Sequence, residues 1–194
     1  MGRKPQFTKD QFSTAALSLV SEGGPKAVTV AAIAARTGAP VGSVYHRFPS
    51  REHLLAEAWL RLAGSFQRGF IDLLEKGDPV EAALYTVRWV RRHPGEAKVL
   101  LLHRKEDLVA RGDWPPGVRR QAADLAGELR SALVSFSKRF FGSPEKRFTR
   151  RSVFALVDIP LAAVRRSLEG DRVPSPAVYS LVRESCEALM RRMP

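Results

Sequence analysis

The sequence predicts an all-α protein of about nine helices, with an N-terminal helix-turn-helix domain of three helices and a larger helical domain after it. Three observations support this class. Apolar residues recur at helical spacing along most of the 194 residues, whereas strand-like alternation is scarce. Breaks containing glycine and proline separate these stretches. The chain is 44% hydrophobic and 27% charged, which is typical of a folded protein with a core.

The first helix is predicted to begin after Thr8, a good N-cap residue, and to run to about Ser21. One face of this helix carries its apolar residues, which are Phe12, Ala15, Ala16, Leu19 and Val20. The sequence Glu-Gly-Gly-Pro at 22–25 ends it.

The second and third helices are predicted to be short and to be joined by a glycine turn. Thr29 is the expected N-cap of the second helix, and Val28 and Ile33 have the spacing of a hydrophobic staple. Gly38 supplies the left-handed residue that stops this helix, and Pro40 can begin the next one, over about 40–46. A helix pair of this kind suits a helix-turn-helix that places its second helix in the DNA major groove.

Long helices are predicted after Ser50, which caps the first of them. Their approximate ranges are 50–76, 79–93, 96–110, 116–141, 145–169 and 175–192, each bounded by glycine or proline. We therefore expect a helix-turn-helix DNA-binding domain over residues 1–50 and a larger helical domain over residues 51–194.

Charge and composition narrow the class of partner. The net charge of +12 favours a partner that carries many phosphates. The single cysteine, Cys186, excludes an intrachain disulfide and fits a reducing compartment. No apolar run approaches the roughly 20 residues that span a bilayer, and residues 1–12 lack the apolar stretch of a signal peptide. These features predict a cytoplasmic protein with no membrane partner.

The predicted recognition helix supplies the candidate DNA contacts. Ala34, Val44 and Phe48 are expected to face inward and to hold the two helices together. The exposed side chains are expected to be those of Pro40, Val41, Ser43, His46 and Arg47, with Gly42 allowing DNA to approach closely. Ser43 and His46 can hydrogen-bond base edges or phosphates, and Val41 can contact a thymine methyl. Phosphates would be met by Thr29, Tyr45 and Arg51, and by Arg3 and Lys4 in a flexible arm.

The same stretch resembles the N-terminal domain of the TetR (tetracycline repressor) family of bacterial transcription regulators. The resemblance covers about residues 7–60. It is carried by Ala15-Ala16-Leu17, Gly23, Val28-Thr29, Ile33-Ala34, Gly38, Gly42, Tyr45, Phe48-Pro49-Ser50 and Leu54-Leu55. Two positions depart from the family pattern. Pro40 stands where the family often has a capping serine or threonine, and Arg51 stands where it has a lysine. The resemblance implies an all-helical homodimer whose C-terminal domain holds a small-molecule effector.

The resemblance also implies that the last two helices form the dimer interface as a four-helix bundle. The residues agree independently, because residues 153–164 are apolar almost all round and the last helix carries an apolar stripe. The expected interface residues are Phe154, Leu161, Val178, Leu181, Val182, Cys186 and Leu189. The alternative is a core within one chain. A dimer would present two recognition helices to a near-palindromic operator.

The effector pocket is expected among the middle helices, where aromatic side chains gather at helical spacing. The candidate residues are Trp59, Phe66, Phe70, Trp89, His103, Trp114 and Asp158. Core packing is the alternative for the aromatic residues. Asp158 lies in an apolar run, where an ionised carboxylate needs a partner: an arginine, the backbone freed by Pro160, or a ligand.

These patterns predict a ligand-responsive regulator that is not an enzyme. The four histidines are scattered, and no cysteine and histidine cluster has metal-ligand spacing, so we expect neither a metal nor a cofactor. The most favoured function is a repressor that binds its operator as a homodimer and is released by an effector. The alternatives are a helical small-molecule sensor or carrier without specific DNA binding, and a peripheral membrane-binding protein.

Overall fold

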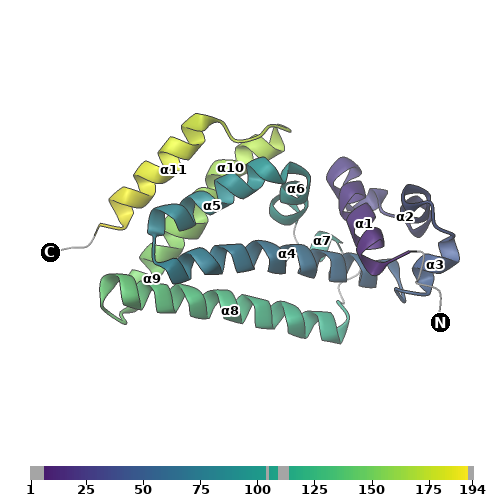
Figure 1. Ribbon diagram of the computed structural model, residues 1–194, viewed down its shortest axis with the longest axis horizontal. Helices are drawn as coiled ribbons and strands as arrows, with labels where there is room; N and C mark the ends of the chain where they lie inside the picture. The colour runs from purple at the N-terminus through teal and green to yellow at the C-terminus, as the bar shows by residue number, and fades with distance from the viewer. Residues whose placement is uncertain (1–6, 104, 109–113, 192–194) are drawn as a thin grey trace. The chain divides into compact units, whose positions relative to one another are not determined.

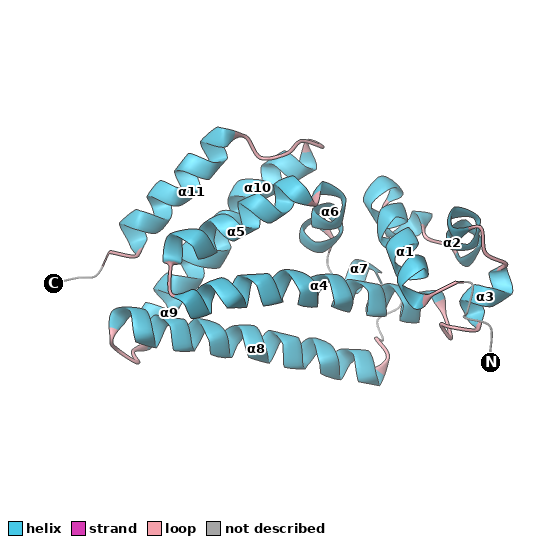
Figure 2. Cartoon of the chain, viewed as in Figure 1, coloured by secondary structure: helices cyan, strands magenta, loops and turns pink. Residues whose placement is uncertain are grey.

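The structure, a computed structural model, describes residues 7–103, 105–108 and 114–191. All regular elements in these ranges are helical, which confirms the predicted all-α class (Figure 2). The described residues form two compact units. The first lies within Met1–Ala63 and Lys98–Ala122, and the second within Gly64–Ala97 and Ala123–Pro194. The functional boundary expected at residue 50 stays a prediction.

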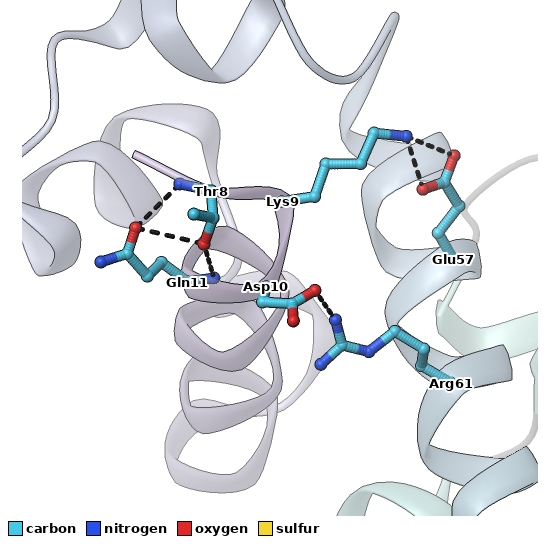
Figure 3. Close-up of polar contacts among 6 residues, drawn as sticks. All are labelled: Thr8, Lys9, Asp10, Gln11, Glu57 and Arg61. Atoms are coloured by element: carbon cyan, nitrogen blue, oxygen red, sulfur yellow. Dashed lines mark hydrogen bonds and ion pairs between the residues drawn. The ribbon is translucent and has the colours of Figure 1, made fainter. Parts of the chain in front are cut away.

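The first unit begins with α1 (Lys9–Gly23), a 3-10 turn (Pro25–Ala27), α2 (Val30–Thr37) and α3 (Val41–Tyr45), and continues into the start of α4 (Arg51–Lys76) (Figure 1). Thr8 caps α1 as predicted. Its hydroxyl accepts from the Gln11 amide at 3.2 Å, while the Gln11 side chain accepts from the Thr8 amide at 2.8 Å (Figure 3). This reciprocal capping box satisfies two backbone donors that the first turn leaves unpaired.

A buried apolar core holds the first unit together. It includes Phe12, Ala16, Val28, Ile33, Val44, Phe48, Leu54 and Leu55. Val28 and Ile33, the expected staple, are both fully buried. Two ion pairs join α1 to α4, one between Lys9 and Glu57 at 3.0 Å and one between Asp10 and Arg61 (Figure 3). Both pairs are exposed, so the apolar core and not these charges carries most of the stability.

The second unit contains the rest of α4, α5 (Pro79–Arg92), most of α8 (Pro116–Phe141), α9 (Lys146–Val153), a π-helical turn (Phe154–Asp158), α10 (Ile159–Glu169) and α11 (Pro176–Leu189). Helix α5 packs against both α10 and α11 (Figure 1). Its buried face carries Ala82, Ala83, Leu84, Thr86, Val87 and Val90. The core of this unit therefore lies around α5.

Two of the predicted helices differ from the structure. The expected helix over 96–110 is instead α6 (Pro94–Leu102) and α7 (Lys105–Leu108), and no glycine or proline marks the break. The expected helix over 145–169 follows one helical path but contains the π-helical turn. Pro160 explains this turn, because its ring opposes the carbonyl four residues earlier. Among the described helices, none is long and apolar enough to cross a membrane.

Candidate nucleic-acid interface

The turn between α2 and α3 is built from the capping residues that the sequence predicts. The Thr29 hydroxyl accepts from the Ala32 amide at 3.0 Å and starts α2. Gly38 adopts φ 67° and ψ 20°, the left-handed conformation that ends it. Pro40 then precedes α3 without any side-chain cap, as its departure from the family pattern implies. Helix α3 is accordingly short, with five residues.

Helix α3 has one buried and one exposed side. Val44 is buried, together with Phe48 and Ala34, which confirms that these three face inward. On the other side, Val41 and Tyr45 are 45% and 56% exposed. Pro40, Gly42 and His46 are also exposed, whereas Ser43 and Arg47 are half-buried. The structure thus gathers most of the predicted base-contacting residues on one exposed surface, which we call the α3 outer face and define as Pro40, Val41, Gly42, Tyr45 and His46.

Thr29 lies at the exposed N-terminus of α2, in the same unit as the α3 outer face. Its backbone and hydroxyl suit a phosphate, because the first amides of a helix favour anions. The predicted arm residues Arg3 and Lys4 lie outside the described residues.

Arg51 requires a correction. Its Nε donates to the Val28 carbonyl and its Nη2 to the Pro25 carbonyl, both at 2.5 Å, and its Nη1 lies 3.2 Å from a Glu52 oxygen. The side chain is only 21% exposed. The guanidinium therefore points into its own unit instead of toward a phosphate. It ties the start of α4 to the 3-10 turn before α2, and sequence spacing gave no signal of this because the partners lie 23 and 26 residues away.

The predicted effector residues fall into separate groups. Trp59 and Trp114 contact each other in the first unit, edge to face, with ring centroids 5.4 Å apart. The Trp59 indole N–H is buried without a hydrogen-bond partner among the described residues. His103, also in the first unit, is half-buried at the end of α6.

A second aromatic group forms in the other unit. Phe66 contacts Trp89 at 4.8 Å between ring centroids, and both Phe66 and Phe70 contact Tyr85. Tyr85 was missing from the prediction, although it lies one helical turn before Trp89 on α5. Its hydroxyl donates to the Phe66 carbonyl at 2.9 Å, and burial raises its pKa. Phe66, Phe70 and Trp89 thus lie together in the second unit.

Asp158 belongs to neither group. It is exposed, so the expectation that it needs a partner in an apolar environment is wrong. The π-helical turn places it with Phe154 on the wall of an open groove of about 920 Å³. The groove is lined by Val134, Pro144, Lys146, Thr149, Arg150, Arg151, Val153, Phe154 and Asp158.

The residues predicted to form the dimer interface differ in how deeply the structure buries them. Phe154 and Leu181 are 52% and 61% exposed, which is unusual for large apolar side chains. Leu161, Val178 and Leu189 are half-buried. Val182 and Cys186 are buried within the single chain, where α11 packs on α5, so they are corrected to core residues. Burial, with Asp78 and Glu187 nearby, raises the pKa of the Cys186 thiol to about 12.

No group of three or more histidine, cysteine, aspartate or glutamate side chains that could hold a metal ion occurs in the described part of the chain. The arrangement that remains is the exposed α3 outer face, in the same unit as the exposed N-terminus of α2. Such a surface can meet base edges and backbone phosphates.

Comparisons with known proteins agree with this geometry. Residues 13–58 match the family described as bacterial regulatory proteins, tetR family. The HTH-type transcriptional repressor KstR of Rhodococcus jostii (strain RHA1) is 45% identical over 65 residues, which are 34% of this chain and 28% of that protein. The match therefore spans less than a third of KstR.

Solved structures share the fold over almost the whole chain. The regulator FadR from Bacillus subtilis, solved in complex with stearoyl-CoA, has a TM-score of 0.71 at 16% identity and covers 96% of this chain and 100% of its own. FadR from Bacillus halodurans has a TM-score of 0.69 at 18% identity, with 97% of each chain covered. At these identities the likeness shows the fold alone.

Proposed function

We propose that this chain is a transcriptional repressor that binds operator DNA through α2 and α3. The premise is that its helix-turn-helix region belongs to the TetR family of bacterial regulatory proteins. The observation that carries the proposal is the α3 outer face. Val41 and Tyr45 are exposed on a helix whose other side is locked into the core by Val44. An element held rigidly and left open on one side is what major-groove readout needs.

The phosphate contacts in this proposal come from Thr29 and Tyr45. Thr29 stands at the exposed N-terminus of α2, and the Tyr45 ring carries its hydroxyl outward from α3. Such contacts position the protein on the duplex without reading its sequence. Base contacts then fall to Pro40, Val41, Ser43, His46 and Arg47.

The repressor is proposed to act as a homodimer. The support is that Phe154 on the π-helical turn and Leu181 on α11 are large apolar side chains left exposed, while Leu161, Val178 and Leu189 are half-buried. A two-fold dimer repeats the same contacts on both chains. Its two α3 helices would meet half-sites about one DNA turn apart, about 34–36 Å, in a near-palindromic operator.

A small-molecule effector is proposed to release the DNA. The support is the group of Phe66, Phe70, Tyr85 and Trp89, together with the FadR structure, in which a protein of this fold holds stearoyl-CoA. Helix α4 contributes Phe66 and Phe70 and also begins at Arg51 beside the 3-10 turn. An effector would change DNA affinity only if it bound two positions of α4 with different affinity.

The experiment is a binding titration with Tyr45→Ala against a duplex selected from a random DNA pool, at one fixed salt concentration. We expect at least a tenfold loss of affinity, since a rigid contact at each half-site is removed. Tyr179→Ala on α11 is the matched control and should bind like the natural chain. Equal affinity of the natural chain for selected and random duplexes would favour the helical sensor or carrier without specific DNA binding.

A further inference from the structure

We propose that Val41 and Gly42 form a seat for the C5-methyl group of a thymine in the major groove, so that this chain selects a T·A pair through an apolar contact. The inference rests on the proposed DNA binding and deepens it, because it assigns one base and one chemical group to named residues. The inference follows from two observations: packing within the chain does not require a glycine at position 42, and Val41 beside it is exposed.

Nothing within the described structure accounts for a glycine at position 42. Its backbone has no positive φ, unlike Gly24 or Gly38, so an L-residue could adopt it. A Cβ built at Gly42 would meet no atom within 4 Å beyond its two chain neighbours and the backbone of its own helix, so packing against the rest of the chain does not exclude a side chain. A glycine inside a helix destabilises that helix relative to alanine. The remaining reason for the missing side chain is close approach of something from outside the chain.

The side chain of Val41, next to Gly42, indicates which chemical group of the DNA approaches. Val41 is 45% exposed, immediately before the bare backbone of Gly42. Tyr45 lies one turn further along and bounds the same face. Val41 offers only methyl groups, so it can neither donate nor accept a hydrogen bond. Within the major groove, the apolar feature that a base presents is the thymine methyl. A valine beside an open glycine therefore fits that group and no other base edge.

The first test removes only the methyl group. Each thymine in the selected duplex is replaced, one at a time, by deoxyuridine, and the affinity is measured at fixed salt. We expect the natural chain to lose about fourfold at one thymine of each half-site, the factor for one methyl-sized group taken out of water. Val41→Ala draws the apolar contact back from the thymine methyl and should reduce this preference. Val173→Ala removes a similarly exposed valine outside the proposed dimer interface and should keep the fourfold preference.

The outcomes separate the inference from the proposed function. If the natural chain binds its selected duplex but no uracil substitution matters, the thymine seat is refuted and DNA binding stands. If a preference exists and is undiminished in Val41→Ala, Val41 does not contact the thymine methyl and the inference fails. If the natural chain selects no duplex at all, the proposed function fails and the inference falls with it.

The second test adds a methyl group at position 42, in the space proposed for the thymine methyl. Gly42→Ala should leave the thermal midpoint unchanged or raise it, since alanine is the better helix former and meets no neighbour. The same variant should bind the selected duplex about tenfold more weakly, because the added methyl occupies the space of the thymine methyl. Binding as tight as that of the natural chain would show that the space is not used, and would overturn the inference.

Discussion

Replacing Arg51 by alanine should destabilise the first unit without removing a phosphate contact. The side chain makes two hydrogen bonds from a charged donor to backbone carbonyls, at 2.5 Å each. Hydrogen bonds of this kind contribute about 1.5–3 kcal/mol apiece. The Pro25 carbonyl keeps a second donor, the Val28 amide at 3.3 Å, so only the Val28 carbonyl loses a specific partner. The side chain is also 21% exposed, so water can replace part of what is lost. We therefore expect a loss of about 2 kcal/mol.

Two measurements check this expectation. Urea denaturation of Arg51→Ala gives the change in the free energy of unfolding. The salt dependence of DNA affinity then reports phosphate contacts, because each phosphate neutralised contributes about 0.9 to the slope of log K against log salt. Because Arg51 donates hydrogen bonds to the Val28 and Pro25 carbonyls, the slope of log K against log salt for Arg51→Ala should equal that of the natural chain.

The control is Arg36→Ala. Arg36 makes a two-pronged pair with Glu22, at 2.5 and 2.6 Å, and both side chains are exposed, so little change is expected. If Arg51→Ala kept the natural stability while its salt slope fell by about one for each protomer, Arg51 would be a phosphate contact and not a link within the first unit.

Further predictions concern the dimer, the buried thiol and a close contact on α4. Phe154→Glu should convert the dimer to a monomer in light scattering, whereas Val173→Glu, an exposed apolar residue outside the proposed interface, should not. The thiol of Cys186 has its pKa raised to about 12, mainly by burial, from an ordinary value of about 9. The unfolded chain therefore loses this proton first, so stability should fall as pH rises from about 9 toward 12, and Cys186→Ala should lose that part of the pH dependence in urea denaturation. Gly69→Ala should lower the thermal midpoint, because its Cβ would collide with the Tyr85 hydroxyl that donates to the α4 backbone.

The helix starts and stops of the N-terminal region could be predicted because each is decided locally. Thr8 and Thr29 hydrogen-bond to amides three residues on, and Gly38 stops α2 by its own φ. Such signals lie within one turn of chain, so spacing and residue type suffice. The inward positions of Val44 and Phe48 followed from helical periodicity for the same reason.

What could not be predicted depends on residues distant in sequence. From the sequence, Arg51 looked like a free cation because its carbonyl partners, Val28 and Pro25, lie 23 and 26 residues earlier in the chain. Asp158 looked buried because its neighbours are apolar, but the π-helical turn carries it to the surface. Cys186 belongs to an apolar stripe whose partner is α5 of the same chain, and its Sγ lies 3.3 Å from the Pro79 carbonyl. Periodicity identifies an apolar face without saying what covers it.

Above all, α2 and α3 are proposed to read a specific DNA sequence. The most direct measurement is the ratio of affinities of the natural chain for a duplex selected from a random pool and for a duplex of the same composition in scrambled order, at one physiological salt concentration. A specific regulator should prefer the selected duplex by about 10³-fold or more. Equal affinities, weakening together as salt rises, would mean that the charge of +12 only attracts phosphates, and would contradict the account.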